Sequence, residues 1–287
     1  MAIGDSTRIN TNIGALNALN ALKTINKALE KSQLKLATGK RINEVADDPA
    51  GFVISTRLNA RSRGLSTALD NVGTAKNVLA IAEGGLLNIS DILVTMKEKV
   101  TQAASDTLGS AERNAIKTEL QQLEAEINNI VDETTFNNLK LLNGSYRNQS
   151  YQTGADTTNV LAINIVKQGT TATGFGASAL EVNTANVATN VFTSAGASQA
   201  LSKVDSAIEV VSEGLQRIGA YTSRLSVKES TLSIAITNTE ATKSRIMDAD
   251  LAREQLNATR NLILQQTSTA QLAQANITPQ NVLALFT

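Results

Sequence analysis

Apolar residues recur every seven positions through the first half of the chain, beginning just after the sequence DDPAG. A second apolar set follows most of them three residues later, which is the spacing of a coiled-coil seam. The two sets are Leu58, Leu65, Val72, Leu79, Leu86, Leu93 and Val100, and Ala68, Ala75, Ala82, Ile89, Met96 and Ala103. The pattern predicts one helix from about Pro49 to Ser105, roughly 85 Å long at about 1.5 Å per residue. The alanines imply close neighbouring helices.

Two further segments keep the same alternation of three-residue and four-residue steps. Ser110 is placed to cap the first of them, and the second begins at about Ala197. The positions that keep this spacing are Ile116, Leu120, Leu123, Ile127 and Ile130, and Leu201, Val204, Ile208, Val211, Leu215, Ile218, Thr222, Leu225, Leu232 and Ala235, all apolar except Thr222. Three such seams bury one another best as a bundle of long antiparallel helices.

Shorter amphipathic patterns stand near both ends of the chain. The N-terminal pattern consists of Leu22, Ile25, Leu29, Ser32 and Leu36, and Gly39 is placed to end that helix. Ile263, Ala270, Ala273 and Ile277 form a similar face near the C-terminus. We therefore expect one helix at each end of the chain.

The helical period is lost between Asn143 and Gly196, where Gly, Ser, Thr and Asn become frequent. Alternation over 160–166 predicts a strand, and ALEVNT at 179–184 suggests another. The middle of the chain is thus expected to be a small β-hairpin region with long loops. The fold class is mainly α, with a coiled-coil-like bundle.

The last six residues include Val282, Leu283, Leu285 and Phe286, although chain ends are normally polar. Burying these four side chains contributes at most about 6–12 kcal/mol, whereas ordering a forty-residue segment costs on the order of 40–80 kcal/mol. We therefore expect the termini to fold when copies of the chain assemble. The alternative is that they form a fourth and a fifth helix of one globular bundle.

Composition narrows the classes of function. The chain has 26 basic and 26 acidic residues without a basic stripe, which argues against nucleic acid as a partner. Its start lacks the features of a signal peptide, and no apolar run is long enough to predict membrane insertion. Cysteine and histidine are both absent, so disulfides, thiolate chemistry and the commonest general base and metal ligand are excluded. We expect no cofactor, no bound metal and no enzymatic activity. A catalytic site built from carboxylates is the alternative that composition leaves open.

Several long motifs resemble the two ends of bacterial flagellin. They are RINTNIGALNALNAL, LATGKRINEVADDPAGFVISTRL, SRIMDADLARE and LILQQTSTAQLAQANITPQNVLALF. The resemblance covers roughly residues 8–142 and 198–286. It implies a structural subunit of the hollow helical filament used for motility, secreted through the flagellar type III export channel. It also implies an inner coiled-coil layer from 1–44 plus 246–287, a helical rod from 45–142 plus 197–245, and outward-facing loops at 143–196.

The same resemblance assigns roles to particular residues. Inner-layer packing between subunits falls to Leu16, Leu22, Ile25, Leu29, Leu36, Ile263, Leu272, Ile277, Val282, Leu283, Leu285 and Phe286. The turn of Asp47, Asp48, Pro49, Ala50 and Gly51 is a helix start by local chemistry and, by resemblance, an axial contact with the next subunit. Implied partners are other copies of the chain, the filament cap, hook-junction proteins and an export chaperone.

Two further sets of residues correspond to family features. Positions that contact an innate immune receptor in many flagellins are Val94, Thr95, Lys97, Glu98 and Glu119 here, and Thr95 replaces a family arginine. Loss of that planar donor predicts weak receptor recognition; otherwise these residues are solvated helix faces. Candidate glycosylation positions are Ser145, Ser150, Thr153, Thr157, Thr158 and Thr171, which serve equally well as turn formers. The competing functions are a hook–filament junction protein and a secreted adhesin or ligand.

Overall fold

Two compact units make up the computed structural model, which describes residues 11–166 and 174–284. The terminal unit consists of the chain up to Ser62 together with the chain from Asn238, and the central unit is Arg63–Thr237. Each unit joins segments that are far apart in the sequence.

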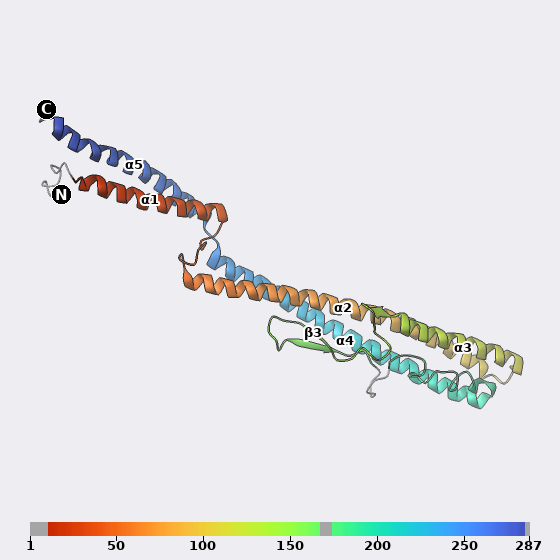
Figure 1. Ribbon diagram of the computed structural model, residues 1–287. Coiled ribbons are helices and arrows are strands. Elements are labelled where there is room, and N and C mark those ends of the chain that lie inside the picture. Colours follow the sequence, from red (N-terminus) through yellow and green to blue (C-terminus); the bar gives the residue numbers. More distant parts are fainter. Residues whose placement is uncertain (1–10, 167–173, 285–287) are drawn as a thin grey trace. The chain divides into compact units, whose positions relative to one another are not determined.

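In the terminal unit, helix α1 (Ile13–Thr38) lies beside helix α5 (Leu251–Ala284) (Figure 1). As predicted, α1 ends at Gly39, which has the left-handed φ of 67°. Polar contacts show that the two helices are antiparallel. Asn12 donates to the Ala275 carbonyl at 2.8 Å and Gln265 donates to Asn26 at 2.8 Å, so the residue number falls in α5 as it rises in α1.

The central unit is built from α2 (Pro49–Ala103), α3 (Ser110–Glu133) and α4 (Ser194–Met247), of which α2 and α4 continue into the terminal unit. Two ion pairs show that α2 and α4 are antiparallel. Lys97 pairs with Asp205 and Lys76 pairs with Glu229, both at 2.7 Å, so the residue number falls in α4 as it rises in α2. The heptad prediction for α2 is confirmed, because the seam from Leu65 to Ala103 is buried in one apolar cluster with residues of α3, α4 and the middle segment. That burial identifies α2 as a core helix, although it is long and apolar enough to cross a membrane by length and composition.

The connection between α2 and α3 corrects one prediction. Ser110 is the first residue of α3 rather than its cap; the cap position is taken by Gly109, which has no capping side chain. Instead, the buried guanidinium of Arg113 donates to the carbonyls of Ala103 at 2.7 Å and Ser105 at 2.8 Å. The first contact satisfies a carbonyl that the end of α2 leaves free, and the second holds the connection that follows α2.

The middle of the chain contains two antiparallel strand pairs. Strand β1 (Thr135–Phe136) pairs with β2 (Leu139–Lys140), and β3 (Gln149–Gln152) pairs with β4 (Val160–Ile163). The predicted strand at 160–166 is therefore confirmed over its first four residues. A short 3₁₀ helix, η1 (Asn190–Phe192), precedes α4.

The second predicted strand, at 179–184, is wrong. Those residues form turns, in which Glu181 has a φ of 61° and the amide of Val182 donates to the carbonyl of Ala177 at 2.9 Å. Leu180 and Val182 are both buried because the turn directs them into the core. Alternating apolar residues in a tight turn thus produced a strand-like pattern.

Candidate assembly surface

Many of the large apolar side chains that the structure describes in the terminal unit are exposed to solvent. Among the side chains described for α1 and α5, Leu29, Ser32 and Ala258 are buried. Leu256 is 68% exposed and Ile263 is 57% exposed. The exposed large apolar residues of this unit are Leu16, Leu19, Leu34, Val45, Val53, Ile54, Leu251, Leu256, Leu262, Ile263, Leu264 and Ile277. Pairing α1 with α5 therefore does not satisfy their apolar faces.

Such a surface points to a partner. Soluble monomers rarely expose large contiguous apolar patches, and those that do usually bind another protein or a membrane there. Full burial of one leucine or isoleucine stabilises a contact by about 1.5–3 kcal/mol. Covering even a few of these residues would thus contribute substantially to association.

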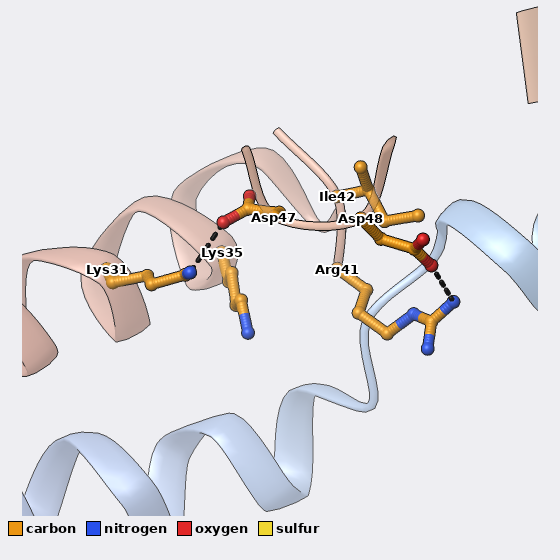
Figure 2. Close-up of a pocket in the computed structure, with 6 residues that line it drawn as sticks. All are labelled: Lys31, Lys35, Arg41, Ile42, Asp47 and Asp48. Carbon is orange, nitrogen blue, oxygen red and sulfur yellow. Dashed lines mark ion pairs between the residues drawn. The ribbon is translucent and has the colours of Figure 1, made fainter. Parts of the chain in front are cut away.

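The linker from α1 to α2 is held by the carboxylate of Asp47, drawn in Figure 2. This carboxylate lies 2.6 Å from the Lys31 ammonium and accepts hydrogen bonds from the amides of Asn43 at 3.1 Å and Glu44 at 3.3 Å. The bond to Lys31, followed by the two amides, lowers the pKa of Asp47 to about 2. In turn, the hydrogen bond to Asp47 raises the pKa of Lys31. The linker is therefore tied back to α1 by a charged contact.

The next residue, Asp48, starts α2 as predicted. Its side chain accepts a hydrogen bond from the amide of Gly51 at 2.9 Å, and Pro49 is the first helical residue. A side chain at Gly51 would place its first carbon 2.5 Å from Asp48 and 2.8 Å from Ile42. The turn is thus packed closely around a position without a side chain.

The two connections of the terminal unit are joined to each other by backbone hydrogen bonds. The amide of Arg41 donates to the Met247 carbonyl at 2.6 Å, and the amide of Ala249 donates to the Gly39 carbonyl at 2.9 Å. The Arg41 guanidinium also donates to the Ile246 carbonyl at 2.8 Å. A hollow of about 210 Å³ beside these contacts is lined by Lys31, Lys35, Arg41, Ile42, Asp47 and Asp48 (Figure 2). Lys31 pairs with Asp47 and Arg41 with Asp48, whereas Lys35 pairs with Glu254 of α5.

The residues expected in the inner layer have different environments in the terminal unit. Leu29 is buried, whereas Leu16, Ile263 and Ile277 are exposed. Leu22, Ile25, Leu36 and Leu272 are half-buried. Val282 and Leu283 belong to α5 but their side chains lie outside the described ones, and Leu285 and Phe286 lie outside the described residues. Sequence reasoning missed Leu256 and Leu262, although α5 has many leucines whose exposure only the fold could show.

The positions expected from the resemblance to correspond to receptor contacts lie on α2 and α3. Val94 and Glu98 are exposed, and the Thr95 hydroxyl donates to the Asp91 carbonyl at 3.0 Å. Lys97 pairs with Asp205 at 2.7 Å, and Glu119 pairs with Lys99 at 2.6 Å. Both charges therefore have partners within their own chain.

The candidate glycosylation positions divide into two groups. Ser145, Ser150, Thr157 and Thr158 are exposed. Thr153 is not on the outward surface: it is buried, and its hydroxyl donates to the Asn159 carbonyl at 3.2 Å. Thr171 lies outside the described residues. In the described chain, no group of three or more acidic side chains could hold a metal ion.

Comparison with known proteins decides the family. The bacterial flagellin N-terminal helical region matches residues 9–147, and the bacterial flagellin C-terminal helical region matches residues 201–286. The chain belongs to the bacterial flagellin family. It is 38% identical over 302 residues to flagellin of Bacillus subtilis strain 168, a match that covers 97% of this chain and 99% of the relative.

Other relatives agree with this assignment. Flagellin of Halalkalibacterium halodurans is 35% identical over 278 residues, and the flagellar filament 41 kDa core protein of Borreliella burgdorferi is 32% identical over 336 residues. Both matches cover 97% of this chain and 99% of the relative. The chain is thus a structural subunit of the extracellular flagellar filament, and the junction-protein alternative is not favoured.

A solved structure supports the fold. A Vibrio parahaemolyticus protein described as flagellar hook-associated has a TM-score of 0.55 and 15% identity, covering 70% of this chain and all of that one. At this identity the likeness shows the helical fold alone.

Proposed function

We propose that the exposed apolar faces of α1 and α5 are the surfaces through which this filament subunit packs against sister copies in the innermost layer. The observation that carries the proposal is the exposure of large apolar residues along both helices, with Leu256 at 68% and Ile263 at 57%. Membership of a self-polymerising family supplies the partner. In the filament, other copies would cover these residues.

Charge distribution supports the same proposal. From Asn261 to Thr287 the sequence has no charged residue, so α5 beyond its first turns offers only apolar and neutral polar side chains. Packing such a helix among copies of itself does not require the burial of an unpaired charge, which would cost several kcal/mol. An assembled core of these helices is therefore electrostatically feasible.

The test uses exposed residues, so that the monomer is not disturbed. Leu256→Gln should leave the helical content and melting temperature of the monomer unchanged, because Leu256 is mostly in solvent already. It should raise the critical concentration for seeded polymerisation about tenfold to a hundredfold, since about 1.5–3 kcal/mol of burial is lost. Sedimentation and electron microscopy would measure this. Unaltered polymerisation would refute the proposal.

Thr259→Gln is the matched control, because Thr259 is exposed on the same helix three residues away. Its hydroxyl donates to the Gln255 carbonyl at 2.9 Å, an exposed bond that a glutamine replaces at little cost. This variant should polymerise like the parent chain. A comparable defect in both variants would mean that α5 tolerates no change, rather than that leucine burial matters.

The finer organisation is supported by the resemblance of both ends of the chain to flagellins. We propose an inner layer from 1–44 plus 246–287, a rod from 45–142 plus 197–245, and an outward region at 143–196, with the turn of residues 47–51 contacting the next subunit along the axis. The filament cap, hook-junction proteins and an export chaperone are the proposed further partners.

Intact mass would test glycosylation of the exposed Ser145, Ser150, Thr157 and Thr158: a mass equal to the bare 30.3 kDa chain contradicts it.

A further inference from the structure

Helix α4 has a second heptad seam on the face opposite its buried one. The buried seam includes Ile218, Leu225 and Leu232. The second seam steps by three and four residues through Ala220, Ser223, Val227, Ser230, Ile234 and Thr237, and every one of these residues is exposed. Val227 is 65% exposed and Ile234 is 60% exposed. A regular seam of small and apolar residues without a charge is suited to close contact with another helix.

A hollow opens beside this seam, next to strand β4. It has a volume of about 300 Å³ and is lined by Leu161, Ser223, Arg224, Val227 and Lys228. Leu161 and Val227 give this lining its apolar part, and Arg224 and Lys228 give it two cations. Arg224 and Lys228 have no ion-pair partner among the described residues. The hollow is therefore suited to an apolar side chain that is flanked by a carboxylate.

An exposed face of α2 has the complementary chemistry. Ala80, Gly84, Leu87, Asp91, Val94 and Glu98 follow the same three-and-four spacing and are all exposed. Leu87 is 48% exposed and Val94 is 46% exposed. Asp91 and Glu98 form no ion pair with the described residues. Among the described residues, no neighbouring atom lies within 4 Å of the space that a side chain at Gly84 would fill, so a helix could approach closely there.

We propose that the exposed seam of α4 in one copy binds the exposed face of α2 in a second copy, with Leu87 or Val94 entering the hollow beside β4. The carboxylates of Asp91 and Glu98 then face the cations Arg224 and Lys228. Within one copy, both faces point away from the buried core, so neither can satisfy the other. This pairing rests on the proposed function, because it requires copies at the density of a filament.

Ser230→Tyr tests the seam, with Ser206→Tyr as its control. Both serines are exposed on α4, and Ser206 lies outside the seam. Neither change should alter the melting temperature of the monomer. Ser230→Tyr should raise the critical concentration for polymerisation at least tenfold, whereas Ser206→Tyr should polymerise like the parent. If Ser230→Tyr assembles as the parent does, the seam is not an interface. If the parent and the control also fail to assemble, the proposed function fails instead.

Engineered cysteines test the pairing itself, since the chain contains none. Copies with Ser230→Cys are mixed with copies that have Leu87→Cys, polymerised and oxidised. A disulfide between the two kinds of copy in filaments, and its absence in dilute monomer, is the expected result. Disulfides that join only Ser230→Cys copies to one another would show that α4 pairs with itself, and would overturn the choice of α2.

Discussion

The ammonium of Lys31 on α1 lies 2.6 Å from the carboxylate of Asp47 in the linker that follows. Since Asp47 also accepts two backbone hydrogen bonds, its pKa falls from 3.8 to about 2. A lowered carboxyl pKa stabilises the fold above pH 3.8, and that contribution is lost as the pH falls towards 2. The contribution is about 2 kcal/mol at most, and less where solvent screens the exposed Lys31.

We therefore predict that the linker loosens in acid over this window. Amide hydrogen exchange of the linker should increase between pH 4 and pH 2 after correction for intrinsic rates. Asp47→Asn retains an acceptor for the amides of Asn43 and Glu44 but removes the charge. The variant should exchange faster at pH 7 and show no further change across the window. A parent-like pH profile in Asp47→Asn would contradict the assignment.

Gly51→Ala should destabilise the start of α2. The added carbon would lie 2.5 Å from Asp48 and 2.8 Å from Ile42, so the capping carboxylate has to move. Loss of a cap costs about 0.5–2 kcal/mol, and overpacking adds to this, while the better helix propensity of alanine returns about 1 kcal/mol. We expect a net loss of about 1–2 kcal/mol in urea unfolding.

Gly73→Ala provides the comparison on the same helix. No neighbouring atom of the part of the chain that the structure describes lies within 4 Å of the space for its side chain. Only the propensity difference remains, so the variant should gain up to about 1 kcal/mol of stability. Equal effects of the two substitutions would show that crowding at Gly51 has no energetic consequence.

Arg113→Lys should weaken the connection between α2 and α3. The buried guanidinium donates to the carbonyls of Ala103, Ser105 and Val191, at 2.7, 2.8 and 3.3 Å. An ammonium cannot reproduce this planar set of donors. Buried acceptors left unsatisfied cost about 1–3 kcal/mol, and we expect a loss of that size in thermal or urea unfolding.

Arg63→Lys is the control for that substitution, because Arg63 is exposed on α2. Its stability should stay within about 0.5 kcal/mol of the parent. Should Arg113→Lys behave in the same way, the carbonyl contacts of Arg113 would be dispensable.

Thr95→Arg should increase recognition by the innate immune receptor for flagellin. The parent has a threonine whose hydroxyl is bonded to its own helix, and its neighbour Lys97 is paired with Asp205. Restoring a multidentate cation should raise potency about tenfold in a cell reporter assay, since one charge-assisted pair contributes about 1.4 kcal/mol or more. Thr101→Arg, at an exposed threonine with the same type of bond to its helix, should not. Full potency of the parent would contradict this prediction.

The sequence was most informative where one periodicity persists. Seven-residue spacing from Leu65 to Val100 predicted both α2 and its buried face. In a helix of this length, a few residues that break the apolar pattern do not obscure its period. Single-residue chemistry also succeeded at Gly39 and Asp48, where one conformation or one capping bond decides the boundary.

Short and polar elements were less predictable. Strand β3, with the sequence QSYQ, has no apolar alternation and exists through its pairing with β4. The turn at Leu180 and Val182 imitated a strand because its fold places both residues inside. The exposure of Leu256 could not be predicted either. An apolar stripe on a helix does not show whether the same chain or another copy covers its residues.

The hydrogen bonds from Arg41 to Met247 and from Ala249 to Gly39 cross-link the outgoing and returning connections of the terminal unit. If the backbone of one connection rotated alone, these two hydrogen bonds to the other connection would lengthen. The two connections are therefore expected to rotate together. Torque that reaches one polypeptide segment is thereby shared with its neighbour, and no single peptide torsion has to bear the load.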